Sequence, residues 1–267
     1  MDYQTARQMF GLPELMDVSS VLVIEPHPDD NEVGAGGTVK RWCDQGTRVT
    51  YLTVTDGRAG AEVQSAYGTT ASSSPNAVVT MADMVRIRRA ERQDANRILG
   101  VEESYNLGFE DGGNWSEYQL MSTLVALIRQ FRPELVMTVD PWTPYESHPD
   151  HVKTGKAVAA ALIYAKNRVM FRDQGEPCAV PQAAFYGSAY PNVYIDVTDT
   201  WEDKLKAMKA HVSQFDIPEW PMLSQYFTGE AERLYRDHLG ERSDGRAEAF
   251  KALISMQLHF FPDAVRS

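Results

Sequence analysis

The chain has 267 residues, 43% of them hydrophobic and 24% charged, and its 37 acidic and 26 basic residues give a net charge of −11. This composition predicts a globular protein with one sizeable core, and the negative charge argues against a nucleic-acid partner or an anionic membrane surface. No run of about 20 apolar residues occurs and the first 20 residues lack a signal-peptide pattern, so we expect a cytoplasmic protein. Cys43 and Cys178 stand in unrelated settings, and we expect both to be structural.

The first 76 residues alternate between strand and helix patterns and then lose their period. Residues 21–24 form a short apolar run, residues 33–45 fit a helix that ends before Gly46, and residues 49–54 are rich in β-branched side chains. Strand, helix and strand within about 35 residues is the length of one βαβ unit. Residues 57–76 are rich in Gly, Ser, Thr and Ala, which predicts a long mobile loop.

The alternation continues with predicted helices over residues 77–99 and 117–131, a strand over 135–139 and a helix over 154–165. This order predicts an α/β fold, a Rossmann-like parallel sheet covered by helices on both faces. Beyond Pro181 we expect strands at 185–187 and 193–197, a helix at 201–211, and two or three shorter helices in 212–267. Residues 1–180 would form the catalytic domain. Residues 181–267 would be a smaller α+β segment that completes the same domain and walls its pocket.

Two clusters of histidine and carboxylate residues follow predicted strands. The first is IEPHPDDNE at residues 24–32, and the second is SHPDH at residues 147–151. Close-set carboxylates repel each other and lose hydration when partly buried, so proteins usually tolerate them around a cation. One His-Pro-Asp sequence is most often only a turn, but two of them at successive strand ends favour a metal site.

The residue types in the two clusters suit a catalytic zinc site. His27, Asp30 and His151 would supply three nitrogen and oxygen ligands and leave one position for water. Asp29 would then be a candidate base for that water, because it adjoins a ligand without being one. His148 would face the other side of a bound carbonyl, where an imidazolium stabilises an oxyanion and protonates a leaving amine.

A nucleotide-binding loop is the alternative reading of residues 34–37, GAGG, which follow the first strand. The dinucleotide fingerprint places its first glycine in the turn between strand and helix, whereas here that turn is HPDDNE, whose negative charge would repel a pyrophosphate. We therefore expect these glycines to let the helix pack closely on the sheet.

A series of motifs along the chain resembles one known family. They are PHPDDNE, GAGGT, VTDGRAG, RIRRAE with ANRILGV, NLGFEDG and DPWTPYESHPDH, spread in this order over residues 19–165. Together they resemble the PIG-L family of zinc-dependent deacetylases, also called LmbE-like proteins. The resemblance implies zinc ligation by His27, Asp30 and His151, a general base at Asp29, and a residue that assists the tetrahedral intermediate at His148.

The resemblance also implies a class of substrate. Members of the family remove the acetyl group from N-acetylglucosamine units in small molecules, and IEPHPDD, HVSQF and MQLHF look closest to the diacetylchitobiose deacetylase branch. Other members of the superfamily hydrate an unsaturated dicarboxylate or cleave amides in thiol conjugates, and Arg58 and Arg88 are cations that could bind substrate carboxylates. Fe²⁺ or Co²⁺ could replace zinc at the same ligands.

The resemblance suggests further substrate-binding residues, each with a simpler alternative. Arg88 of RRAE would bind substrate, or would only form a surface ion pair with Glu91. Asp111 would contact sugar hydroxyls, or would only belong to a turn. Some relatives carry a tyrosine two residues before HPDH, where this chain has Glu146, with Tyr145 one step earlier.

A histidine near the end of the chain is the last candidate. His259 lies in the apolar sequence LHFF, where a histidine is most often a packed core residue. The resemblance to chito-oligosaccharide deacetylases implies instead that it borders the substrate pocket without touching the metal. We expect a homo-oligomer, a trimer or hexamer, in which a neighbouring subunit could supply this wall.

Overall fold

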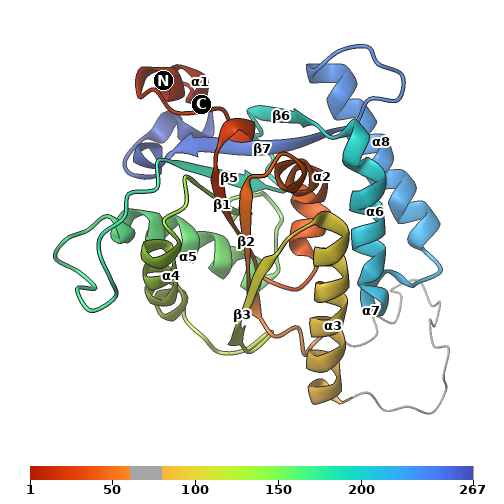
Figure 1. Cartoon of the computed structure of the whole chain (residues 1–267), viewed down its shortest axis with the longest axis horizontal. Helices are drawn as coiled ribbons and strands as arrows, with labels where there is room; N and C mark the ends of the chain where they lie inside the picture. Colours follow the sequence, from red (N-terminus) through yellow and green to blue (C-terminus); the bar gives the residue numbers. More distant parts are fainter. Residues whose placement is uncertain (61–79, 267) are drawn as a thin grey trace.

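A seven-stranded mixed sheet forms the centre of the computed structural model, which describes residues 1–60 and 80–266 (Figure 1). Its strands are β1 (Ser20–Glu25), β2 (Arg48–Thr55), β3 (Glu103–Phe109), β4 (Leu135–Val139), β5 (Gln182–Tyr186), β6 (Val193–Asp196) and β7 (Ala247–Ile254). They lie in the order β3-β2-β1-β4-β5-β7-β6. The first five are parallel, whereas β7 runs antiparallel to both β5 and β6.

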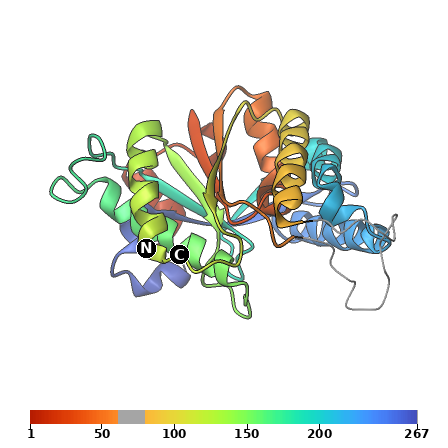
Figure 2. The same ribbon diagram turned by 90° about the horizontal axis from the view of Figure 1, so that it is seen from below.

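Helices cover both faces of this sheet, as Figure 2 shows from below. The longer ones are α2 (Asp30–Asp44), α3 (Met81–Leu99), α4 (Glu117–Phe131), α5 (Pro149–Ala165), α6 (Trp201–Ala210) and α8 (Trp220–His238). Two short helices are α1 (Tyr3–Met9) and α7 (Val212–Phe215). Helices α4 and α5 pack together on one face, and α2, α3 and α6 pack together on the other. The predicted α/β architecture is confirmed.

Alternate residues of the central strands enter two different cores, which explains why these strands are apolar throughout. In β1, Val21 and Val23 belong to the core beneath α2 and α6, and Leu22 and Ile24 belong to the core beneath α4 and α5. Parallel strands that are buried on both faces lose the alternation of polar and apolar residues seen in half-exposed sheets. The apolar run at residues 21–24 therefore predicts a buried strand, but it does not show which side chain faces which layer of helices.

The order of strands brings the two predicted clusters together. β1 pairs with β4, with Val21 opposite Leu135 and Ile24 opposite Thr138. Chain connections run in opposite directions from these two strands, so their carboxyl ends form the crevice in which open α/β sheets bind ligands. Residues 26–30 leave β1 here, and residues 140–151 leave β4 here.

Glycines of α2 let this helix approach the sheet and α6. A β-carbon at Gly34 would clash with the Cδ2 edge of the Tyr186 ring, and one at Gly37 would lie 2.7 Å from Cβ of Val197. Real side chains do not approach that closely, so both contacts require glycine. The expectation that the GAGG glycines serve close packing is confirmed.

The expectation for residues 212–267 was partly wrong. We expected two or three shorter helices, but this segment contains the long helix α8 and the strand β7. β7 escaped prediction because AEAFKALI mixes alanine and charged residues, and it becomes a strand by pairing with β5 and β6, a tertiary contact. β3 and α1 were not predicted either, and α5 begins at Pro149 rather than near residue 154.

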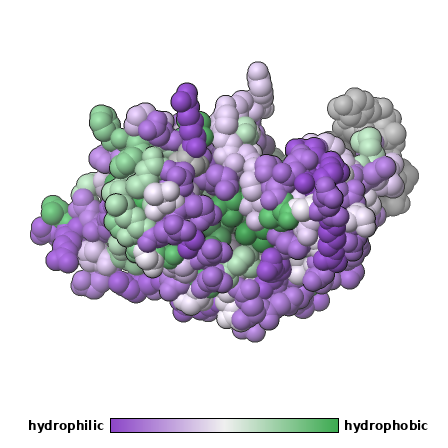
Figure 3. All heavy atoms as spheres, turned by 90° about the horizontal axis from the view of Figure 1, so that it is seen from above, coloured by the Kyte–Doolittle hydropathy of each residue, from purple (hydrophilic) through white to green (hydrophobic). Residues whose placement is uncertain are grey.

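Several remaining expectations concern the surface and the loops. Most of the predicted loop at 57–76 lies outside the described residues. Cys43 and Cys178 form no disulfide. Among the helices that the structure describes, none is long and apolar enough to span a bilayer. Figure 3 shows one face of the molecule, where hydrophilic residues predominate and hydrophobic atoms gather near the centre.

Candidate metal centre and active site

The turn after β1 folds His27 and Asp30 onto each other. The backbone N–H of His27 donates to Oδ2 of Asp30 at 2.8 Å, and the same oxygen lies 3.2 Å from Nδ1 of the His27 ring. Asp30 is the first residue of α2, where the positive end of the helix dipole favours a carboxylate. The local geometry therefore presents a side-chain nitrogen and a carboxylate oxygen from one turn.

The second cluster lies at the start of α5. His148 is the N-cap of this helix, and its Nδ1 accepts a hydrogen bond from the backbone N–H of Asp150 at 3.3 Å. His151 follows in the first turn, with its Nδ1 3.1 Å from Oε2 of Glu146. Glu146 also accepts the backbone N–H of His148 at 2.7 Å, so this carboxylate orients both histidines.

The two clusters meet at Asp30. Its Oδ2 lies 3.2 Å from Nδ1 of His27 and 3.5 Å from Nε2 of His151. Tetrahedral zinc ligands about 2.0–2.2 Å from the ion are separated by roughly 3.3–3.6 Å from each other. These two separations are close to that size, so the carboxylate of Asp30 lies at a distance from each histidine that a shared divalent ion requires.

Carboxylates also surround the other nitrogen of His27. Its Nε2 lies 3.3 Å from Oδ1 of Asp111 and 3.6 Å from Oδ2 of Asp150. Burial alone would lower the pKa of His27, but these two carboxylates and Asp30 raise it to about 12. The three carboxylates around His27 thus favour a cation at the centre of the site.

Other groupings of these side chains also have metal-ligand spacing. Donor atoms of His27, Asp111 and Asp150 lie within 4.8 Å of one another, as do those of His27, His148 and His151. Asp150 is already engaged, because Lys153 lies 2.8 Å from its Oδ1 and the backbone N–H of Gly112 donates to its Oδ2 at 2.8 Å. The sequence suggests no role for Asp150, although it is the acid of the HPDH motif.

Asp29 has an unusual backbone and a charged neighbour. Its φ is 150° and its ψ is −21°, a conformation that side-chain-bearing residues rarely adopt and that is retained where the surroundings impose it. Nη2 of Arg88 lies 3.2 Å from its Oδ1. Burial raises the pKa of Asp29 to about 7, while Arg88 acts in the opposite direction.

The predicted substrate-binding residues lie in different surroundings. Arg88 is 3% exposed and donates to the carbonyl of Pro28 at 2.8 Å, so it is not a surface ion-pair residue. Arg58 pairs with Asp56 and with Glu110, 2.8 Å away.

Of the other three candidates, one contacts the cluster and two are exposed. Asp111 adjoins His27. Tyr145 is fully exposed, with a φ of 69°. His259 is exposed just after the last strand and, among the described residues, is not part of the cavity beside the cluster.

A buried ionic network beneath the site was not foreseen. Glu32 lies 3.0 Å from Nη1 of Arg92 and 3.1 Å from Nε2 of His211, and Glu25 also pairs with Arg92. The last acid of PHPDDNE therefore links α2 to α3 and to the end of α6. Sequence spacing could not reveal these contacts, because residues 60 and 179 positions away supply the partners.

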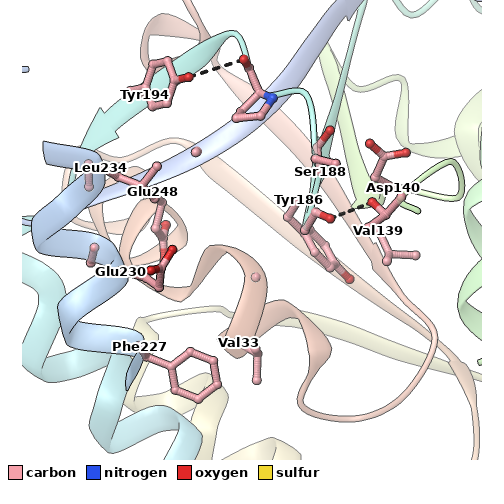
Figure 4. Close-up of a pocket in the computed structure, with 18 of the residues that line it drawn as sticks. Val33, Val139, Asp140, Tyr186, Ser188, Tyr194, Phe227, Glu230, Leu234 and Glu248 are labelled. Atoms are coloured by element: carbon pink, nitrogen blue, oxygen red, sulfur yellow. Dashed lines mark hydrogen bonds between the residues drawn. The ribbon is translucent and has the colours of Figure 1, made fainter. Parts of the chain in front are cut away.

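A cavity of about 750 Å³ adjoins Asp30 and His151 (Figure 4). Near the cluster it is bordered by Val33, Gly34 and Tyr186, and further away by residues of β6, α6, α8 and β7. In Figure 4, Phe227, Glu230 and Leu234 on α8 lie across the cavity from Tyr186 and Val139. The cluster thus comes from residues before 180, whereas the lining of the cavity comes from residues before and after 180.

Histidine and carboxylate side chains at the switch point of an α/β sheet define the class of protein as one with a metal-dependent hydrolytic site. Comparison with known proteins gives the family. Residues 22–162 match the PIG-L family, described as GlcNAc-PI de-N-acetylase. The chain belongs to this family.

Individual relatives extend the similarity along the chain. The diacetylchitobiose deacetylase of Thermococcus kodakarensis is 34% identical over 93% of this chain and 88% of its own length. A probable N-acetyl-alpha-D-glucosaminyl L-malate deacetylase 2 of Bacillus cereus is 29% identical over 73% of this chain and 83% of its own. The structure of the Pyrococcus horikoshii N,N'-diacetylchitobiose deacetylase with its inhibitor MPG superposes with a TM-score of 0.83, at 28% identity, over 98% of this chain and 97% of that one.

Proposed function

We propose that the protein is a metal-dependent hydrolase that removes the acetyl group from a small molecule containing N-acetylglucosamine. The observation that carries the proposal is the position of Oδ2 of Asp30, 3.2 Å from His27 and 3.5 Å from His151, at the carboxyl ends of β1 and β4. The relatives from Thermococcus kodakarensis and Bacillus cereus are deacetylases of such compounds, which supports the same substrate class.

The ligands that we propose for the ion are His27, Asp30 and His151, and the ion that we expect is Zn²⁺, with Fe²⁺ or Co²⁺ as chemically suitable replacements. When bound, such an ion supplies a Lewis acid that activates water and polarises the amide carbonyl. Asp111 and Asp150, whose carboxylate oxygens lie 3.3 and 3.6 Å from the outer nitrogen of His27, would orient the ring in this assignment.

Asp29 and His148 are the residues that we propose to move protons. Asp29 takes the proton of the attacking water, a role that its raised pKa of about 7 suits at neutral pH. His148, exposed at the start of α5, stabilises the developing oxyanion and gives a proton to the amine as the C–N bond breaks. The products are acetate and a free amino sugar.

We propose that the rest of the substrate contacts the residues around the outer side of His27. Asp111 is the candidate partner for sugar hydroxyls, because its carboxylate lies at the cluster. Arg58 is a weaker candidate, because Asp56 and Glu110 already pair with it. Tyr145 would contact only parts of a substrate that extend into solvent, since its side chain is fully exposed.

Hydration of an unsaturated dicarboxylate is the alternative chemistry. The hydratase GalB of Pseudomonas putida shares the fold, with a TM-score of 0.71 at 20% identity. Such a substrate needs cations for its carboxylates, but Arg88 pairs with Asp29, and Arg58 pairs with two carboxylates. Because both arginines are already paired, the site favours amide hydrolysis over hydration of a dicarboxylate. An acidic thiol conjugate is disfavoured for the same reason, since it also needs a free cation.

Acetate release and metal content together test the proposal. The protein loaded with Zn²⁺ should release acetate from N-acetylglucosamine or diacetylchitobiose, and His151→Ala should lose both the bound ion and the activity. Lys156→Ala, an exposed change on the same helix, serves as the control and should retain both. One tightly bound ion per chain in His151→Ala would show that the ligand set is wrong.

A further inference from the structure

The cavity beside the metal cluster is much larger than an acetyl group needs. Its volume is about 750 Å³, which lies in the range of about 300–1,000 Å³ that holds whole small ligands. The methyl of an acetyl group is close in size to a water molecule, whose share of liquid volume is about 30 Å³. Most of the cavity therefore remains for some other part of a substrate.

The lining of this cavity suits an apolar group. Its apolar side chains are Val33, Val139 and Tyr186 on the cluster side and Phe227 and Leu234 of α8 on the opposite wall (Figure 4). Polar residues of the same lining on the cluster side are Asp140, Thr143, Glu146 and Ser188. Tyr186 is 4% exposed, and its ring is held against Gly34, where a β-carbon would overlap it. Two polar side chains beside it are already engaged, because Glu146 contacts His148 and His151, and the hydroxyl of Thr143 donates to the carbonyl of Gly187 at 2.7 Å. The Val33, Val139 and Tyr186 side chains therefore offer an acyl chain an apolar contact near the cluster.

Three buried charged residues line the cavity, and two of them, Lys204 and Glu248, are paired with each other. The third, Asp140, accepts the backbone N–H of Trp142 at 2.9 Å. Nζ of Lys204 lies 2.6 Å from Oε1 of Glu248 and also donates to the carbonyl of Val33 at 2.8 Å. Glu248 further accepts the backbone N–H groups of Gly37 at 3.0 Å and Thr38 at 2.8 Å. Each group is 4% exposed, so this pair forms a neutral floor.

The position of the cavity relative to the cluster identifies which part of an amide it faces. It borders Asp30 and His151, whereas His148, Asp29 and Asp111 are absent from its described lining. A carbonyl carbon carries two substituents, the amine and the acyl chain. In the proposed mechanism the amine lies toward His148, which protonates it, so the acyl chain lies toward the cavity.

We propose that this cavity is an acyl pocket and that the protein hydrolyses N-acyl amino sugars whose acyl chain is longer than acetyl. The inference rests on the proposed function, because it assigns the amine side of the amide to His148. The chemistry is unchanged: water forms the new C–O bond, the C–N bond breaks, and the products are a short-chain carboxylate and a protonated amine. Chains longer than acetyl extend toward the apolar side chains of Tyr186 and, across the cavity, of Phe227 and Leu234 on α8.

A chain-length series of N-acylglucosamines tests the pocket. The zinc-loaded protein is assayed with N-acetyl, N-propanoyl, N-butanoyl and N-hexanoyl glucosamine, and kcat/KM for the longer chains should remain within about tenfold of the acetyl value. Binding is measured separately on Asp29→Asn, and affinity should rise by up to about fourfold for each added methylene that becomes buried. A sugar-binding cavity would give neither trend.

Two cavity variants locate the effect. Ala249→Leu fills the β7 side of the cavity, and Leu234→Ser makes the α8 side polar, at positions that are both half-buried. Each should lower the ratio of hexanoyl to acetyl kcat/KM by about tenfold. The exposed change Lys156→Ala should leave this ratio as it is in the unaltered protein.

The outcomes separate this inference from the proposed function. Acetyl hydrolysis with a loss of more than a thousandfold on passing to propanoyl would overturn the acyl pocket and leave the deacetylase intact. Hydrolysis of none of the amides would overturn the proposed function. The binding series then still decides about the pocket, because equal or weaker binding of the hexanoyl compound contradicts it without any turnover.

Discussion

The guanidinium of Arg88 holds the carboxylate of Asp29, with 3.2 Å between Nη2 and Oδ1. The same nitrogen donates to the carbonyl of Pro28 at 2.8 Å, so one buried cation fixes both the backbone and the side chain of the turn. Asp29 has a φ of 150°, and such strain persists only where neighbouring contacts impose it. Sequence resemblance suggested that Arg88 binds substrate, whereas these contacts favour a role in positioning the base.

Replacement of Arg88 distinguishes the two roles. If Arg88 positions Asp29, Arg88→Ala should lower kcat by about ten- to a hundredfold with little change in KM, because the base is misplaced after substrate has bound. Arg88→Lys should restore part of kcat. A large rise in KM at nearly unchanged kcat would instead assign Arg88 to the substrate. Metal content is measured in parallel and should not change.

Removal of the proposed base gives a second prediction. Asp29→Asn keeps the size of the side chain and does not touch the proposed ligands, so the protein should still bind one divalent ion. Turnover should fall by about two to four orders of magnitude, the usual contribution of a positioned general base. Near-native turnover in this variant would exclude Asp29 from the mechanism.

The pH profile tests His148. Burial, together with the positive charge near His27 and His151, lowers the pKa of His148 from its usual value of about 6.5. The active form needs Asp29 ionised, with a pKa of about 7, and His148 protonated, so the two groups titrate as a pair. The rate should therefore pass through a maximum and fall at higher pH, as the pair loses the proton that His148 donates. His148→Gln should remove that alkaline limb and slow the reaction. An unchanged bell-shaped profile at a lower rate would argue against the role.

The sequence was sufficient to predict which residues gather at the ends of the strands. It was not sufficient to predict the contacts between segments that are distant in the chain. The pairs His27 with Asp30 and His148 with His151 are local, and the order of predicted strands was enough to bring them to one edge. Other contacts join segments that lie far apart in the sequence, where no repeated pattern links the partners. Examples are Arg88 with Asp29, Glu32 with His211, and Asp150 with Gly112. β7 is a further case, because its pairing with β5 and β6 comes from the fold rather than from its own residues.

Two glycine-to-alanine changes test the packing of α2. Gly37→Ala would place a β-carbon 2.7 Å from Cβ of Val197, so it should lower the free energy of unfolding by about 1–3 kcal/mol. Gly229 lies within α8 with nothing within 4 Å of its β-carbon position, so Gly229→Ala should raise that energy by about 0.5–1 kcal/mol. Urea denaturation measures both, and equal effects would contradict the close packing of α2.

The last prediction concerns His259, which is not among the described residues that line the cavity beside the cluster. It is exposed after β7, beside Phe260, which is 96% exposed and has a φ of 63°. An exposed histidine next to an exposed aromatic residue is not the packed core residue that the apolar sequence first suggests. We therefore expect it to reach the substrate of a neighbouring subunit in a homo-oligomer, as a wall of that pocket.

If that is so, His259→Ala should raise KM for an N-acetylated sugar more than it lowers kcat, and metal content should not change. Mixing gives the sharper measurement. Asp29→Asn has intact His259, and His259→Ala has intact Asp29, so subunits of the two variants, unfolded and refolded together, should form some sites that contain both residues. These mixtures should recover low-KM activity that neither variant has alone. A monomeric protein, or mixtures without any gain, would show that His259 does not serve a neighbouring site.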